Sequence, residues 1–154
     1  MITLTDKDFN GNHEFINESY FNADNDRYEF NDDLTVDVKY SIFKKSIFVS
    51  GYQYVRGDQY VRGDQSVSGF KLLKSKGIIS VNFIGSRKSA TKFLFTRESG
   101  IMVKCGCYFG TIDNFKTRVS KVHKDNQHAH EYFNAIEYAV KMYEYYKSIE
   151  PEYV

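Results

Sequence analysis

Two cysteines and three histidines are the residues whose types and spacing most readily suggest chemistry. Cys105 and Cys107 flank a single glycine, which places both thiols on one face of a strand, and His123, His128 and His130 follow. Two thiolates and two imidazoles can hold zinc, but structural zinc sites favour two to four residues between the cysteines. His128 and His130 face different ways on a helix. The sequence therefore predicts no metal, no cofactor and no catalytic residue, and the protein is not expected to be an enzyme.

The segment Gly85–Ser89 is a candidate phosphate site. Its backbone amides, together with the side chains of Arg87 and Lys88, are suited to an anion, and Lys92, Lys104 and Arg118 are expected nearby. The alternative is a plain basic turn between two strands. That alternative is favoured because no Walker-type or dinucleotide-binding glycine pattern surrounds the segment.

The charged residues are unevenly divided along the chain. Residues 1–37 contain ten acidic and two basic side chains, a net charge of −8, whereas the remainder contains 19 basic and 10 acidic side chains, a net charge of +9. Such asymmetry indicates a partner attracted by electrostatics, and the alternative is an acidic edge that only keeps the protein solvated. The candidate partner-binding face consists of Asp24, Asp26, Glu29, Asp32 and Asp33.

A six-residue repeat in the middle of the chain is the strongest indication of architecture. It is marked by Val49, Val55, Val61 and Val67, by Gly51, Gly57, Gly63 and Gly69, and by Gln53, Gln59 and Gln65. Six residues fit a short extended segment plus a corner, for which glycine supplies unusual backbone angles. The repeat predicts a β-solenoid with the valines and glutamines facing inward. The alternative is a pair of hairpins with Gly-Asp turns.

The C-terminal half has the pattern of a small α+β unit. Three strands are expected at 78–84, 90–96 and 101–105, followed by a helix capped by Thr111 and a second helix over about 128–146. The expected fold is mainly β with α: a hexapeptide-type β-solenoid capped by three antiparallel strands and two helices. The expected domains are 1–76, an acidic cap with the solenoid, and 77–154, the α+β unit.

The second helix indicates a binding partner, and the composition indicates where the protein is located. The helix is apolar around much of its circumference, which predicts contact with its own sheet and with a second copy of the chain. No apolar run reaches the 18 residues of a membrane span, and the first residues lack the layout of a signal peptide. Two cysteines alone fit a reducing cytoplasm.

The repeats and a set of C-terminal motifs together resemble a family of uncharacterised phage and prophage proteins. The matching segments are the repeats from Gly51 to Gly69, then IGSR (84–87), VKCGCYFGT (103–111), Phe115, Val119, His123, and Ala129, Glu131 and Tyr132. The sequence departs from the pattern at Lys88, Ser89, Ala90 and Lys124, and the first 48 residues do not match. The resemblance implies an accessory protein of a bacterial virus, located in the cytoplasm of the bacterial host, and it carries over no catalytic residue.

Three functions remain open at this stage. The first is a phage-encoded, non-enzymatic inhibitor of a host antiviral defence system, similar to an anti-CRISPR protein, whose acidic face binds a host defence protein or nuclease complex and mimics nucleic acid. The second is a homo-oligomeric structural or assembly protein of a phage, in contact through the C-terminal helix. The third is a small-nucleotide-binding protein that sequesters a signalling nucleotide at the Gly85–Ser89 turn.

Overall fold

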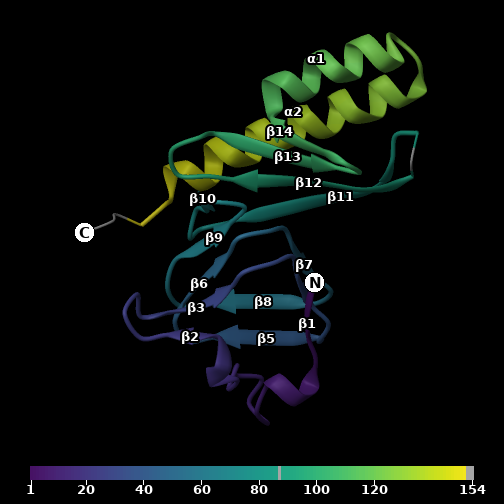
Figure 1. The fold of residues 1–154 in the computed structure, drawn as a ribbon. Coiled ribbons are helices and arrows are strands. Elements are labelled where there is room, and N and C mark those ends of the chain that lie inside the picture. The colour runs from purple at the N-terminus through teal and green to yellow at the C-terminus, as the bar shows by residue number, and fades with distance from the viewer. Residues whose placement is uncertain (87, 152–154) are drawn as a thin grey trace. The chain divides into compact units, whose positions relative to one another are not determined.

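The protein, described by a computed structural model over residues 1–86 and 88–151, divides into two compact units. The N-terminal unit spans Met1–Lys71 and the C-terminal unit spans Leu72–Val154 (Figure 1). The sequence places this boundary later, between residues 76 and 77. Leu73 already belongs to the second unit, because its N–H donates to the Phe95 carbonyl over 2.8 Å.

Three small sheets make up the N-terminal unit. The first contains three parallel strands, β1 (Ile2–Leu4), β4 (Leu34–Val36) and β7 (Gln53–Val55). The second contains two parallel strands, β5 (Tyr40–Phe43) and β8 (Asp58–Val61). The third is mixed, with antiparallel pairs at both edges, in the order β10 (Phe70–Lys71), β9 (Gln65–Val67), β6 (Ser46–Val49), β3 (Arg27–Phe30) and β2 (Phe21–Asn22). Two short 3₁₀ helices, Asp6–Asp8 and Glu18–Tyr20, precede β2.

The predicted hexapeptide-type β-solenoid is wrong. The strands form several small sheets that are parallel, antiparallel or mixed, in place of one stack of six-residue turns. Successive repeats do not pair with one another, since β7, β8 and β9 belong to three different sheets. Each pairs in parallel with a strand much earlier in the chain; Leu34 lies opposite Gln53, and Tyr40 lies opposite Asp58. These long-range parallel pairs also rule out hairpins with Gly-Asp turns between the repeats.

Between residues 53 and 63 the repeat nevertheless alternates between exposed positions and positions that are buried or partly buried. Val49 and Val67 are fully buried, whereas Val55 and Val61 are only partly buried. The glutamines meet inside the unit: the Gln53 amide donates to the Gln59 carbonyl oxygen over 2.9 Å and accepts from Gln65 over 2.6 Å. These hydrogen bonds satisfy the amide of the buried Gln53, whose desolvation would otherwise be unfavourable.

Aliphatic and aromatic side chains together form the core of the N-terminal unit. The ring of Phe15 lies 4.8 Å from that of Tyr28 and 5.0 Å from that of Phe43, centroid to centroid. Phe30 and Phe43 are fully buried beside them. The first 30 residues therefore contribute directly to this core.

A four-stranded antiparallel sheet forms the base of the C-terminal unit. Its order is β11 (Ile78–Ile84), β12 (Ser89–Phe95), β13 (Ile101–Cys105) and β14 (Tyr108–Thr111). The sequence predicts only three strands and misses β14, which lies between the third of them and the helix. Tyr108 pairs with Cys105 and Thr111 with Met102, so the segment completes a tight hairpin before the helix begins.

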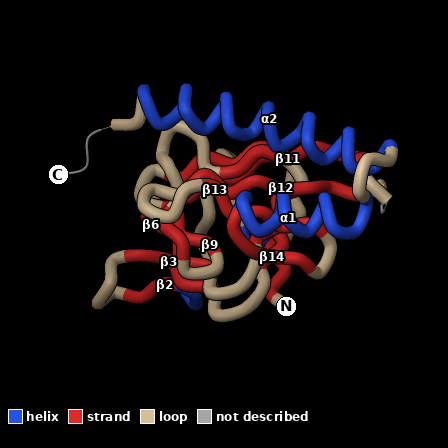
Figure 2. The backbone as a smooth tube through the Cα atoms, turned by 90° about the horizontal axis from the view of Figure 1, so that it is seen from above, coloured by secondary structure: helices blue, strands red, loops and turns tan. Residues whose placement is uncertain are grey.

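Two antiparallel helices cover one face of this sheet (Figures 1 and 2). Helix α1 (Ile112–His123) begins after Thr111, whose side chain accepts from the Asn114 N–H as predicted. Helix α2 (Gln127–Ser148) begins after Asn126, whose side chain accepts from the Ala129 N–H. The helices bury their inner faces on the sheet in one cluster that includes Phe93, Val103, Phe115, Val119, Tyr132, Ile136 and Ala139.

Candidate functional site

Four of the five residues of the predicted acidic face lie at the two ends of one strand, β3. Asp24 and Asp26 are in the turn that precedes β3, and Asp32 and Asp33 follow it. Glu29 lies within β3 itself. Because an extended strand rises about 3.3 Å per residue, the two aspartate pairs do not form one cluster.

Most of these carboxylates are paired with cations of their own unit. Asp26 contacts the Lys45 ammonium over 2.9 Å, and Asp32 contacts the amino group of Met1 over 2.6 Å. Glu29 accepts from Asn25 and from Arg27, and these hydrogen bonds hold its pKa below the usual range. The charge split along the sequence is therefore partly neutralised inside the N-terminal unit.

Asp33 supports the backbone of the unit. One oxygen of its carboxylate accepts from the Tyr52 N–H over 2.8 Å. The same oxygen lies so close to Gly51 that a Cβ at this position would meet it. Asp24 is exposed, and its N–H donates to the Asn22 side chain. Of the five predicted residues, Asp24 is thus the one whose described contacts leave its carboxylate most accessible.

The predicted phosphate turn connects β11 and β12. Gly85 has a positive φ of 74°, and the Lys88 N–H donates to the Gly85 carbonyl over 3.3 Å. That bond closes a tight turn and removes one of the amides that an anion would need. Arg87, the other predicted residue, lies outside the described residues.

The cysteines and histidines are only partly brought together. Cys105, Cys107 and His123 line one cavity, whereas His128 packs beside His123 with ring centroids 5.4 Å apart. His130 points to Asp125, with Nε2 3.2 Å from its carboxylate. Within residues 1–86 and 88–151, no three or more His, Cys, Asp or Glu side chains gather in a way that could hold a metal ion.

Cys105, Cys107 and His123 line a cavity in the C-terminal unit. It has a volume of about 190 Å³ and mostly apolar walls. Its residues come from the β11–β12 turn, the β13–β14 hairpin and both helices: Ser86, Cys105, Cys107, Tyr108, Phe115, Arg118, Val119, Val122, His123 and Tyr132. The walls therefore combine four segments that are well separated in the sequence.

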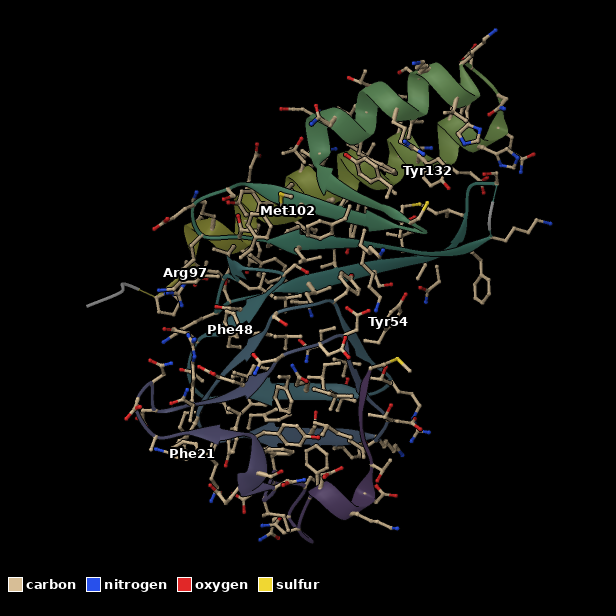
Figure 3. All side chains as sticks on the ribbon, in the orientation of Figure 1. Phe21, Phe48, Tyr54, Arg97, Met102 and Tyr132 are labelled. Carbon is tan, nitrogen blue, oxygen red and sulfur yellow. The ribbon has the colours of Figure 1, made fainter. Side chains whose placement is uncertain are left out.

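Tyr132 fixes the inner wall of the cavity. Its side chain extends from α2 toward the sheet and is 3% exposed (Figure 3). Its hydroxyl oxygen accepts from the Cys105 thiol over 3.6 Å, and that sulfur accepts from the Thr91 hydroxyl over 3.6 Å. The Tyr132 ring also packs against Gly85, where no side chain could be accommodated. The wall is therefore held from the sheet, the turn and the helix together.

Arg118 and Tyr108 form the polar rim of the cavity. The guanidinium carbon of Arg118 lies 5.6 Å from the centroid of the Tyr108 ring, in a cation–π contact. The Tyr108 hydroxyl donates to the Thr111 carbonyl over 3.0 Å. Burial raises the pKa of Tyr108, and the positive charge of Arg118 opposes this rise.

Sequence reasoning missed the cavity, although it quoted many of its residues. Ser86, the two cysteines, Tyr108, Phe115, Val119, His123 and Tyr132 all belong to the C-terminal motifs of the resemblance. Arg118 and Val122 lie outside those motifs. The sequence predicts Arg118 near the Gly85–Ser89 turn, and Arg118 and Ser86 of that turn line the same cavity. The helical spacing of Arg118, three residues after Phe115, is the further signal that connects it to the wall formed by α1.

Comparison of the chain with models of protein families, with curated proteins and with solved structures gives no match. In the described part of the chain, neither α1 nor α2 has the length and apolarity that crossing a membrane requires. The functional argument therefore depends on the geometry of the cavity and on the charges around it.

Proposed function

We propose that this protein is a non-enzymatic binding protein whose C-terminal unit holds a small, ring-bearing ligand in the cavity. The observation that carries the proposal is the convergence of four separate segments on one cavity of about 190 Å³. Binding sites for small molecules are concave, mainly apolar and lined by a few polar groups. This cavity has aromatic and aliphatic walls with Ser86, His123 and Arg118 as its polar groups.

The contacts of the thiols support binding rather than catalysis. A cysteine nucleophile needs a base within hydrogen-bond reach. The described partners of the Cys105 sulfur are the hydroxyls of Tyr132 and Thr91, which are weak bases. His123 packs by ring contacts on His128 and Tyr132. In a phage accessory protein, such a cavity would serve to sequester a host molecule.

Blocking the cavity should abolish ligand binding. Val122 lines the cavity and is 60% exposed, so Val122→Trp should fill the cavity opening at little cost in stability. Purine and indole serve as probes, followed by chemical-shift changes at residues such as Cys105 and Tyr132. We expect at least one probe to bind the wild type and to bind Val122→Trp about tenfold or more weakly, through lost contact area.

Ser120→Trp is the matched control for this variant. Ser120 is exposed on the same helix and is not part of the cavity wall, so its replacement should leave binding unchanged. The bound probe should also be recovered unaltered after the protein is denatured. The proposal fails if neither probe perturbs the cavity residues of the wild type.

The acidic N-terminal residues support a second candidate, inhibition of a host defence nuclease. Residues 1–37 carry a net charge of −8, and Asp24 in the β2–β3 turn is exposed. Clustered negative charge accelerates association with a basic nucleic-acid site. This candidate is weakened because Asp26, Glu29 and Asp32 already have cationic partners.

Neutralising the β2–β3 turn tests the second candidate. The variant Asp24→Asn with Asp26→Asn removes two charges, and asparagine tolerates the positive φ of 50° at Asp26. If this turn binds a CRISPR nuclease, we expect about tenfold less protection of an infecting phage, measured by plating efficiency on a CRISPR-positive bacterium. Asp113→Asn with Asp125→Asn is the control with an equal change of charge. Equal protection by both variants would reject the acidic-face mechanism.

Self-association through α2 is a further proposal for a partner. Tyr138, Tyr145 and Ile149 recur on its outer side and are each more than half exposed, at 53%, 54% and 52%. Exposed aromatic rows of this kind are enriched at protein interfaces. They support a homo-oligomer, as expected for an assembly protein, independently of the cavity.

A further inference from the structure

The Arg118 guanidinium carries an uncompensated positive charge at the rim of the cavity. The nearby carboxylates have their own partners: Asp113 lies 3.8 Å from the Lys116 ammonium, and Glu131 lies 3.5 Å from His128. Among residues 1–86 and 88–151, no carboxylate forms an ion pair with Arg118. An arginine at the edge of an apolar cavity, free of a carboxylate, is suited to an anion that enters with the ligand.

The position of Arg118 is restrained by the cavity wall itself. Its guanidinium rests over the Tyr108 ring, which is tied to the start of α1 by the hydrogen bond to Thr111. A planar guanidinium held in this way keeps its N–H donors available at little entropic cost. Ser86 adds a hydroxyl to the same cavity, from the β11–β12 turn. Together they provide donors for two different oxygens of one anion.

The inner part of the cavity favours a planar ring. Tyr108, Phe115 and Tyr132 contribute three aromatic side chains, and Phe115 meets Tyr132 edge to face at 5.5 Å. Rings stack on such walls, while His123 and the thiols can hydrogen-bond to heteroatoms at the edge of a ring. The cavity therefore pairs a ring-binding interior with a cationic rim.

We propose that the ligand is a mononucleotide, with its base in the cavity and its phosphate on Arg118. This inference rests on the proposed function and adds the chemical class of the ligand. A phosphate is favoured over a carboxylate because its several oxygens can reach the guanidinium fork and the Ser86 hydroxyl at once. The phosphate would thus contact the side chains of Arg118 on α1 and Ser86 in the turn, in place of the backbone amides of the turn with Arg87 and Lys88 that the sequence suggested.

Matched nucleosides and their 5′-monophosphates test the inference by calorimetry on the full chain. We expect one monophosphate to bind about tenfold more tightly than its nucleoside at low salt, because the phosphate adds charge-assisted hydrogen bonds. Arg118→Gln should remove most of this difference, because it should weaken the monophosphate far more than the nucleoside. Lys121→Gln, an exposed cation on α1 outside the cavity wall, should preserve the difference.

The outcomes separate this inference from the proposed function. Equal affinities for nucleoside and monophosphate, or a difference that survives Arg118→Gln, would overturn the mononucleotide and leave cavity binding intact. Tighter binding of a short oligonucleotide than of any monophosphate would also overturn it, in favour of a nucleic-acid end. If nucleosides, monophosphates, purine and indole all fail to bind, both the inference and the proposed function fall.

Discussion

Gly57→Ala is expected to destabilise the N-terminal unit severely, by about 3 kcal/mol or more. A Cβ at this position would strike the carbonyl oxygen of Lys39 and come within 2.7 Å of that of Val38. Both are backbone atoms of a neighbouring segment, so neither can turn away as a flexible side chain would. Urea unfolding followed by far-UV circular dichroism should show the loss as a lower midpoint.

Gly11→Ala is the matched control for this variant. Nothing lies within 4 Å of a Cβ at Gly11, and its φ is not in the positive region. Its replacement should change the free energy of unfolding by less than about 1 kcal/mol, and in the stabilising direction if the unfolded chain loses freedom. Equal unfolding midpoints for Gly57→Ala and Gly11→Ala would show that the short distance between Gly57 and the backbone of Lys39 does not affect stability.

Similar close approaches explain the glycine at the first three of the four repeat positions. A Cβ at Gly51 would meet Asp33, and one at Gly63 would meet Ser46. The sequence attributed the recurring glycines to corners with unusual backbone angles. That reason is wrong for Gly51, Gly57 and Gly63, none of which has a positive φ, but it fits Gly69, whose φ is 81°. Sequence alone cannot separate the two causes, because both simply require the absence of a Cβ.

Local elements could be predicted from the sequence, whereas strand pairing could not. The Thr111 cap, the helix that follows it and the strands β11 to β13 were all indicated by local patterns. The parallel pairs of the N-terminal unit join segments such as Leu34 and Gln53 that no local pattern connects. The alternation of a repeat defines which side chains face inward, but many sheet arrangements satisfy the same alternation.

The candidate site likewise depends on long-range contacts that the sequence does not reveal. Composition revealed the excess of acidic residues near the N-terminus. It could not reveal that Lys45 forms an ion pair with Asp26, because that contact depends on the fold. The cavity is lined by Ser86, Arg118 and Tyr132, which come from the β11–β12 turn, α1 and α2. Residue types suggested a metal site and a phosphate site, each within a short stretch of sequence. The cavity instead arises from tertiary packing, which brings together residues that indicate no binding site individually.

Gly85→Ala is expected to disrupt the cavity and to destabilise the C-terminal unit by about 3 kcal/mol. Two costs combine at this position. The positive φ of 74° is unfavourable for any residue with a Cβ, and that Cβ would overlap the ring and hydroxyl of the buried Tyr132. Relief of the overlap requires Tyr132 to move, which would separate its hydroxyl from the Cys105 thiol. Urea unfolding and probe binding should therefore weaken together.

Gly100→Ala separates these two costs. Gly100 has a similar φ of 71°, but nothing lies within 4 Å of a Cβ there, so its replacement should cost only the backbone term, about 1 kcal/mol. The excess for Gly85→Ala then measures the contact with Tyr132, and it should shrink in a Tyr132→Leu background, as coupled neighbours require. If both alanine variants lose the same stability and bind purine or indole equally well, Gly85 does not position the cavity wall. If only Gly85→Ala loses binding, the wall that Tyr132 forms against the turn is what holds the ligand.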